Sequence, residues 1–280
     1  MMNEWKGRFL AVLIGCFFPE IFTLSSCLRQ YHFVNQSLNW TEAQIYCRQN
    51  YRDLATIEDP EELKQLINGV SSAGVGSDVW IGLYNQIHWR WSDGFTGKGA
   101  DYRNWNTTDS DPDFISANQF CVNIGDGGEW WDRSCGNNFT SICYRGTQLD
   151  PELVLVSKSL TWSGAQKHCR ENFVDLVSVR NDMENRKIQS LVPQSKRSWI
   201  GLFRDPDLFW SDGSSFGFGF WDGGKNVIGS MTVICGVTSV QRSGKWKFLS
   251  CDQRLPFVCY SPGKQRISKE KRLEDKSLFG

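Results

Sequence analysis

Acidic residues of a kind that can bind calcium are concentrated in the segment WNTTDSDPDFISANQFC, residues 105–121. Asp111 and Asp113 flank Pro112, and Cys121 follows ten residues after Asp111. Calcium takes about six to eight oxygen ligands, and carboxylates are prominent among them. The segment is therefore either part of a calcium site or a polar surface loop that binds no ion.

Residues that would support catalysis are few. The histidines are His32, His88 and His168, and no two of them have the spacing of zinc ligands. The sequence also has no glycine-rich phosphate loop, and nothing in it groups a nucleophile, a base and an orienting residue. The sequence therefore predicts a protein that is not an enzyme.

The charge balance argues against nucleic acid as a partner. The chain has 280 residues with 31 Lys+Arg against 31 Asp+Glu, so its formal net charge is zero. A nucleic-acid-binding protein would need a basic face. Ten cysteines are more than a reduced cytosolic protein usually carries, which indicates an oxidising compartment.

The N-terminal segment has the layout of a secretory signal peptide. Lys6 and Arg8 precede an apolar run over residues 9–18, and small residues follow at 23–26. The competing interpretation is a membrane anchor, but Pro19 and Glu20 interrupt the run well short of the ~20 residues that cross a bilayer. We predict a signal peptide over residues 1–26, no membrane span in the mature chain, and a secreted, extracellular protein.

The rest of the chain contains one pattern twice. NWTEAQIYCRQNYRDL is followed by WIGL, WRWSDG and YRNW, and TWSGAQKHCRENFVDL by WIGL, WSDG and FGFW. The offset between copies is 122 residues at Trp40/Trp162 (162 − 40) and 116 at Cys143/Cys259 (259 − 143), so the copies differ by loop deletions. We place the two domains at residues 27–145 and 150–261. The charged, aperiodic tail over 262–280 is predicted to be disordered.

Local signals give the same elements in each copy. Thr41 with Gln44, and Ser163 with Gln166, suit a capping box at the start of a first helix. A second helix is predicted from Asp59-Pro60 in one copy and from Asn181 in the other. Short segments rich in Trp, Val, Ile and Phe follow, with Gly and Asp between them, and these predict strands and turns. The predicted class is α+β.

This ordered set of motifs resembles the C-type lectin-like domain, present here as a tandem pair over roughly residues 27–261. It looks most similar to small tandem-domain fish lectins or to part of a mannose-receptor-type array. The resemblance implies two domains, each with two helices, short antiparallel strands, a long loop and two disulfides. It also places four motif tryptophans in the core: Trp80, Trp91, Trp199 and Trp210.

The resemblance further implies how the cysteines pair, whereas the sequence alone allows three connectivities in each domain. The implied pairs are Cys47–Cys143, Cys121–Cys135, Cys169–Cys259 and Cys235–Cys251. Cys16 lies in the predicted signal peptide. Cys27 is left over, and a disulfide-linked dimer, a free thiol and trimming beyond it all remain open.

The best-known activity of the resembled family is calcium-dependent sugar binding. By position in the motifs, the implied metal ligands are Asp111, Asp113 and Asp132, with Gln119 and Trp131 completing the ligand-binding set. The three carboxylates preserve the charge for an ion. Trp131 offers no oxygen, however, and Gln119 is the only amide left to donate to a sugar hydroxyl. The sequence therefore predicts no definite cofactor. The alternative is calcium bound in domain 1.

The second copy lacks the residues for such a site. Lys225, Asn226 and Val227 occupy the tripeptide position, and Lys247 and Phe248 stand where an Asn-Asp pair is expected. This copy is predicted to have no calcium site.

The long loops are the remaining candidate recognition surfaces. Phe216, Lys247 and Phe248 are candidate ligand-binding residues of the second copy, and Phe114, Ile115 and Phe120 lie in the loop of the first. The alternative is that these rings are loop core. Four glycosylation sequons all fall in the first copy, at Asn35, Asn39, Asn106 and Asn138. The second copy is therefore expected to present the barer surface for protein contact.

These observations predict a secreted, disulfide-bonded glycoprotein of the C-type lectin type. Its expected partners are glycans, glycoproteins or proteins, bound without the usual calcium-sugar mode. The alternative is a calcium-dependent carbohydrate-binding lectin that acts through domain 1.

Overall fold

A computed structural model describes residues 29–263 of the chain. The predicted signal peptide, Cys27 and nearly all of the predicted tail lie outside these residues. The helices are α1 (Trp40–Asn50), α2 (Pro60–Ser72), α3 (Trp162–Asn172) and α4 (Asp182–Gln189), with short 3₁₀ turns η1 (Ile115–Ala117) and η2 (Val240–Arg242). Each repeat thus supplies two helices, as expected.

Fourteen strands form two seven-stranded sheets. The first sheet has the order β1-β14-β3-β12-β13, with β11 paired to β3 and β2 to β14. The second has the order β6-β5-β10-β7-β8, with β4 paired to β10 and β9 to β7. The strands of the first repeat are β1 (Gln30–Leu38), β2 (Asp53–Leu54), β3 (Val79–Gln86), β4 (Arg90–Trp91), β5 (Cys121–Gly125), β6 (Trp130–Arg133) and β7 (Phe139–Gly146). Those of the second are β8 (Pro151–Leu160), β9 (Asp175–Leu176), β10 (Arg197–Phe203), β11 (Phe209–Trp210), β12 (Val233–Thr238), β13 (Lys247–Ser250) and β14 (Leu255–Ser261). The predicted α+β class is confirmed.

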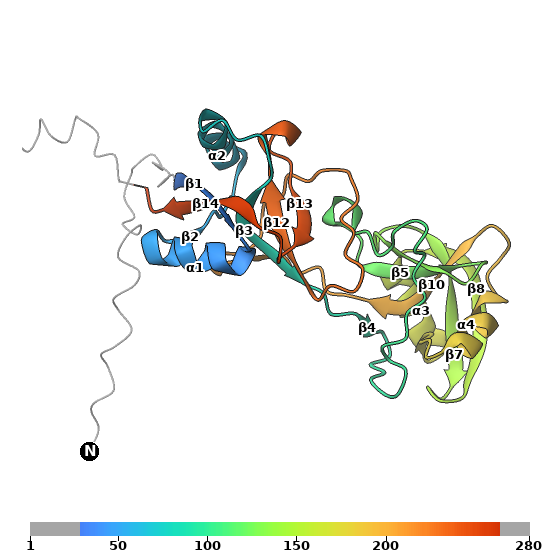
Figure 1. Cartoon of the computed structure of the whole chain (residues 1–280). Coiled ribbons are helices and arrows are strands. Elements are labelled where there is room, and N and C mark those ends of the chain that lie inside the picture. Colours follow the sequence, from blue (N-terminus) through green and yellow to red (C-terminus); the bar gives the residue numbers. More distant parts are fainter. Residues whose placement is uncertain (1–28, 264–280) are drawn as a thin grey trace, which may run out of the picture. The chain divides into compact units, whose positions relative to one another are not determined.

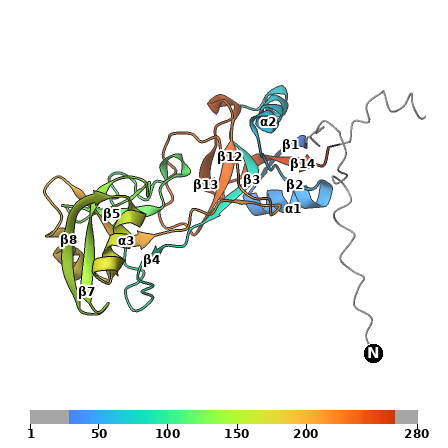
Figure 2. The same ribbon diagram turned by 180° about the vertical axis from the view of Figure 1, so that it is seen from behind.

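Each sheet is built from both repeats. The first sheet, with α1 and α2, joins β1–β3 of the first repeat to β11–β14 of the second, and we call it the terminal module. The second sheet, with α3 and α4, joins β4–β7 to β8–β10, and we call it the central module. Figure 1 shows this exchange by colour: blue and orange strands share one sheet, and green and yellow strands the other. The same pairing is visible from behind in Figure 2. The structural modules therefore do not follow the boundaries of the sequence repeats.

The exchange is stable because the repeats carry equivalent residues at the pairing positions. Leu83 of β3 pairs with Trp210 of β11, and Leu202 of β10 pairs with Trp91 of β4. Each WIGL strand thus meets the WSDG motif of the other repeat. Since both repeats contain both motifs, exchange replaces a pairing within a repeat by a nearly identical pairing between repeats.

The disulfides follow the exchange. Cys47 of α1 bonds Cys259 of β14, and Cys143 of β7 bonds Cys169 of α3. The expected pairs Cys47–Cys143 and Cys169–Cys259 were therefore wrong. A helix cysteine still bonds a last-strand cysteine, but the strand comes from the other repeat. The inner pairs Cys121–Cys135 and Cys235–Cys251 are confirmed.

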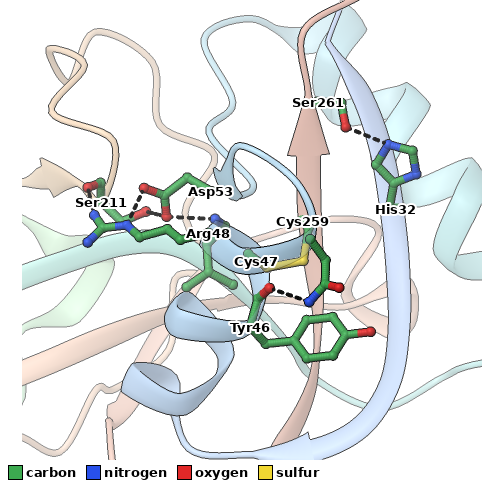
Figure 3. Close-up of a disulfide and its surroundings, with 10 residues drawn as sticks. His32, Tyr46, Cys47, Arg48, Asp53, Ser211, Cys259 and Ser261 are labelled. Carbon is green, nitrogen blue, oxygen red and sulfur yellow. Dashed lines mark hydrogen bonds and ion pairs between the residues drawn. A yellow bond between two sulfur atoms is a disulfide. The ribbon is translucent and has the colours of Figure 1, made fainter.

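Polar contacts reinforce the exchange beside the Cys47–Cys259 bond (Figure 3). Arg48 donates from Nε to Asp53 Oδ2 at 3.0 Å and from Nη2 to the carbonyl of Ser211 at 2.8 Å, and Ser211 Oγ donates to Asp53 Oδ1 at 2.8 Å. The central module repeats this triad with Arg170, Asp175 and Ser92. In each triad the Arg–Asp pair belongs to one repeat and the serine to the other.

The tryptophans of the WIGL and WSDG motifs lie in the cores, as expected. Trp80 and Trp199 are 0% exposed, and Trp91 and Trp210 are 3% and 1% exposed. Indole rings of this size bury much apolar area and account for a large share of the core.

Helix starts were predicted correctly for the second helix of each repeat and incorrectly for the first. Asp59 and Asn181 are the N-caps of α2 and α4. The first helices begin earlier than expected: Asn39 caps α1 in a reciprocal capping box with Glu42, and Thr161 caps α3. The earlier start makes Trp40 and Trp162 the first residues of α1 and α3, and both are buried there. Burial of these tryptophans therefore decides where each helix begins.

Within residues 29–263 the structure contains no helix with the length and apolar character needed to cross a membrane.

Candidate functional site

Three carboxylates converge in the loop that follows Trp105. Asp109, Asp111 and Asp113 each offer one oxygen, and these oxygens lie within 4.8 Å of one another. Asp111 and Asp113 are buried, at 5% and 0% exposure, and the Asp111–Pro112 peptide bond is cis. The structure thus brings together two of the three implied metal ligands and adds Asp109.

The third implied ligand, Asp132 of β6, has other partners. Its Oδ1 accepts the backbone N–H of Asp113 and its Oδ2 that of Phe114, both at 2.9 Å. Asp132 is 0% exposed, and burial raises the pKa of its carboxyl group against the opposing effect of these bonds. Both oxygens of Asp132 therefore hold the loop in place.

The charge of the cluster is lower than three ionised carboxylates would give. Burial, and then the neighbouring Asp132 carboxyl, raise the pKa of Asp111 to about 8. Ionisation of Asp111 is consequently disfavoured in this structure. The sequence-based expectation that all charge for an ion is retained does not take this burial into account.

Two cations of the chain already lie at the cluster. Lys225 Nζ is 3.2 Å from Asp113 Oδ2 and 2.5 Å from Asp109 Oδ1, and Arg133 Nη1 is 3.4 Å from Asp111 Oδ1. The hydrogen bond between Lys225 and Asp109 raises the pKa of the lysine and lowers that of the acid. Lys225 belongs to the second repeat, so the acidic loop of one repeat is neutralised in part by the other.

The remaining implied ligand residues face inward. Gln119 Oε1 accepts the N–H of Ile115 at 2.7 Å, and Gln119 is 8% exposed. Trp131 is 8% exposed, and the guanidinium of Arg197 lies 4.0 Å from the centroid of its ring. Trp131 is therefore a packing residue rather than an accessible ligand contact.

These residues do not fit the calcium arrangement that the resemblance implied. The oxygens of Asp132 and Gln119 are committed to backbone amides, and Trp131 supplies no oxygen. Cationic groups lie at Asp111 and Asp113, where the ion would need free carboxylates. Among the oxygens of the acidic cluster, Asp111 Oδ2 and the two side-chain oxygens of Asp113 are buried without a hydrogen-bond partner in the described residues.

The corresponding segment of the second repeat is hydrogen-bonded to the acidic loop. Asn226, 3% exposed, donates its backbone N–H to the carbonyl of Asp113 at 2.6 Å and its Nδ2 to the carbonyl of Phe114 at 2.9 Å. Its Oδ1 accepts the N–H of Phe248 at 2.7 Å. Sequence reasoning placed Asn226 at a decayed calcium position and missed that it binds the other repeat.

Arg204 is a second buried contact that the sequence did not reveal. It is 1% exposed, donates to Asn85 Oδ1 at 2.6 Å, and lies 3.9 Å from the centroid of the Phe114 ring. Burial lowers its pKa to about 10. Its only sequence signal was a charge next to the hydrophobic strand β10, which is equally typical of a surface arginine.

The second repeat presents a partly exposed aromatic segment, residues 216–221, which we call the aromatic loop. Its rings pack against one another and against two buried tryptophans; the rings of the loop are Phe216, Phe218, Phe220 and Trp221. Within residues 29–263, the buried Trp210 and Trp246 have no acceptor for their indole N–H. Their counterparts in the central module, Trp91 and Trp130, donate to Ala100 O at 2.9 Å and to Asn185 Oδ1 at 2.8 Å.

The other residues predicted for this surface differ in how far their side chains are exposed. Lys247 is partly exposed, with Nζ 2.9 Å from Asp78 Oδ2, whereas Phe248 is only 3% exposed and stacks on Trp221. Phe216 is accessible, and Phe248 belongs to the core beneath it. In the first repeat Phe114 is 0% exposed, so the alternative of loop core applies to it.

The four sequon asparagines differ in accessibility. Asn35 and Asn138 are exposed, whereas Asn39 and Asn106 are partly buried and use their side-chain oxygens locally. Asn106 accepts the N–H of Asp109 and so shapes the turn that leads into the acidic cluster.

Comparison with known proteins gives the same assignment to both repeats. The family model described as "Lectin C-type domain" matches residues 36–145 and 158–261. Among curated relatives, human "Lymphocyte antigen 75" is 28% identical over 275 residues, covering 84% of this chain, and the mouse "Secretory phospholipase A2 receptor" is 27% identical, covering 81%. The chain spans only 15% and 17% of these two relatives. Human "C-type mannose receptor 2" is 27% identical, with 86% of this chain and 18% of the relative covered.

Solved structures were also compared. The crystal structure of CEL-IV aligns with a TM-score of 0.36 at 13% identity and covers 85% of this chain and 89% of that one. Human lithostathine aligns with a TM-score of 0.31 at 13% identity, with 93% and 100% covered.

Proposed function

The chain belongs to the family of C-type lectin domains, and from this premise we propose that it is an extracellular recognition protein for carbohydrate-bearing or protein ligands. It binds these ligands without the calcium-sugar chemistry for which the family is best known. Binding, and not catalysis, is the general property of the family, and the proposal includes no catalytic step. Secretion through the signal peptide at residues 1–26 is part of the proposal.

The observation that carries the calcium-free mode is the commitment of Asp132. Its two oxygens each accept a backbone N–H, from Asp113 and from Phe114, so an ion at Asp132 would compete with the two bonds that hold the loop in place. A sugar bound in the family's usual way needs an ion with open coordination positions and amide donors beside it. The residues at this cluster supply neither an ion site with open coordination positions nor the amide donors.

The aromatic loop is the proposed contact surface. Its rings are partly exposed, and Lys247 adds a cationic group beside them. Aromatic faces suit both sugar rings and protein interfaces, in which Trp, Tyr and Arg are enriched. Sequons are absent from the second repeat, so glycans of the chain itself would not cover this loop.

The second candidate is a calcium-dependent lectin that acts through domain 1. Convergence of Asp109, Asp111 and Asp113 within 4.8 Å favours it, as do the unpartnered oxygens of Asp111 and Asp113. Under this alternative, removal of calcium abolishes glycan binding.

A binding experiment separates the two candidates. The secreted protein is applied to a glycan array, and to immobilised serum glycoproteins before and after enzymatic deglycosylation, in calcium and in EDTA. We expect binding that persists in EDTA, is lost in Phe216→Ala and is kept in Met183→Ala, a matched change at an exposed apolar residue (69% exposed) of the central module. Binding that requires calcium and is lost in Asp111→Asn supports the alternative. Absence of binding to every probe contradicts both.

A further inference from the structure

The acidic loop contains buried carboxylates that need compensation. The side chains of Asp111 and Asp113 are 0% and 1% exposed, and three of their four oxygens form no hydrogen bond in the described residues. An ionised carboxylate without a partner is strongly disfavoured in a protein interior. In the resembled family an ion would provide the compensating charge, so the question is which group provides it here.

The ammonium group of Lys225 lies in the position to do so. Its Nζ contacts three oxygens: the carbonyl of Asp109, Oδ1 of Asp109 at 2.5 Å and Oδ2 of Asp113 at 3.2 Å. The two contacts with Asp109 are hydrogen bonds, whereas the contact with Asp113 Oδ2 is an ion pair without hydrogen-bond geometry. Arg133 adds a second cation, at 3.4 Å from Asp111 Oδ1.

The backbone around Lys225 is fixed to the acidic loop. Asn226 N donates to Asp113 O at 2.6 Å, and Ile228 N donates to Pro112 O at 3.1 Å. Asn226 Nδ2 adds the bond to the carbonyl of Phe114. Segments 111–114 and 225–228, which contain the tripeptide positions 111–113 and 225–227 of the two repeats, therefore bind each other.

We infer that Lys225 replaces the metal as the resident cation of the acidic loop, and that segments 111–114 and 225–228 form a lock between the two repeats. The lysine is tethered beside the carboxylates, so its effective concentration there is high, and free calcium must displace it. The lock concerns stability and ion response, and it holds whether or not the aromatic loop binds a ligand.

The test is a calcium titration followed by thermal unfolding of the secreted protein and of Lys225→Met. We expect the wild-type midpoint to be the same in EDTA and in millimolar calcium. Lys225→Met is expected to unfold at a lower temperature in EDTA and to be stabilised by calcium, because the carboxylates of Asp109 and Asp113 then lack their cation. For one site above saturation, the midpoint rises by roughly 3 to 6 °C per tenfold increase in calcium. Lys245→Met, at an exposed lysine of the same repeat, is the matched control and should behave as wild type.

The outcomes are decisive in both directions. A wild-type midpoint that rises with calcium as much as that of Lys225→Met overturns the inference, and so does a Lys225→Met protein with an unchanged midpoint and no calcium response. If Lys225→Met fails to fold, the double variant with Asp113→Asn and Lys225→Met is measured instead. Removal of both charges should restore folding. Failure of the double variant to recover overturns the pairing. Glycan and glycoprotein binding are separate readouts, so failure of the proposed function leaves this result unaffected.

Discussion

Replacement of Phe114 by alanine should strongly destabilise the protein. The ring is 0% exposed, its centroid lies 5.1 Å from that of Phe120 and 5.7 Å from that of Phe248, and the Arg204 guanidinium lies 3.9 Å away. Removing a buried phenylalanine ring costs about 3–5 kcal/mol. At roughly 2–4 °C per kcal/mol for a protein of this size, the melting midpoint should fall by about 6–20 °C.

The control and the assay make this prediction specific. Phe209→Ala removes the same side chain from a site that is 37% exposed, where the ring stacks on Tyr84, and should cost only about 1–2 kcal/mol. Urea unfolding of both variants, followed by tryptophan fluorescence, gives the two free energies. If Phe114 lay in a solvent-exposed recognition loop, both variants would lose similar, small amounts, and that result would refute the packing described here.

Two further changes test buried contacts of the fold. Burial would raise the pKa of Asp212, but hydrogen bonds from Ser214 N, Tyr260 and Thr56 outweigh it and lower the pKa below its ordinary value. These bonds stabilise the fold above the unfolded-state pKa, and the effect is lost as the pH falls through the folded-state pKa. Asp212→Asn should therefore lower the free energy of unfolding by about 1 kcal/mol at pH 7, a low value because the group is partly exposed. Urea unfolding near pH 3 should show a much smaller loss. An equal loss at both pH values contradicts this prediction. Gly201→Ala should lower the free energy of unfolding measured in urea by about 1–3 kcal/mol, because a Cβ there would lie 3.0 Å from Leu176 O and 3.1 Å from Val177 O. Gly217→Ala, with open space around it, should be neutral.

Local features of the fold were predictable because they depend on neighbouring residues. Asp59 and Asn181 mark the starts of α2 and α4, and the inner disulfides join cysteines only 14 and 16 residues apart. The buried motif tryptophans followed from their size and repetition. The first helices were misplaced by two residues because Thr41 and Ser163 also suit a capping position, and only burial of the preceding tryptophan decides between them.

The exchange between repeats was not predictable from the same signals. WIGL and WSDG occur in both copies, so the sequence fits a pairing within a repeat as well as a pairing between repeats. Contacts between residues far apart in the sequence distinguish the two pairings. Arg204 of one repeat bonds Asn85 of the other, and Arg90 pairs with Asp205. Such contacts have no local signature in a sequence.

The sequence indicated that acidic side chains would gather at this loop, and it did not reveal the groups that contact them. Asp111, Asp113 and Asp132 do lie together, linked by the bond from Asp113 N to Asp132 Oδ1. Counting residues within each repeat placed Lys225 at the tripeptide position of the second repeat. A lysine at that position only predicts that the second repeat lacks a calcium site. The structure instead places it against the acids of the first repeat, because the repeats are bonded through these loops.

Cleavage of the link between the repeats tests the exchange most directly. Residues 147–150 between β7 and β8 are exposed, with Leu149 at 75%, so a specific protease site can be inserted there. The exchanged disulfides Cys47–Cys259 and Cys143–Cys169 each join one fragment to the other. After complete cleavage, denaturing electrophoresis without reductant should show one species of full mass that separates into two only on reduction. Two separate fragments without reductant would contradict the exchange.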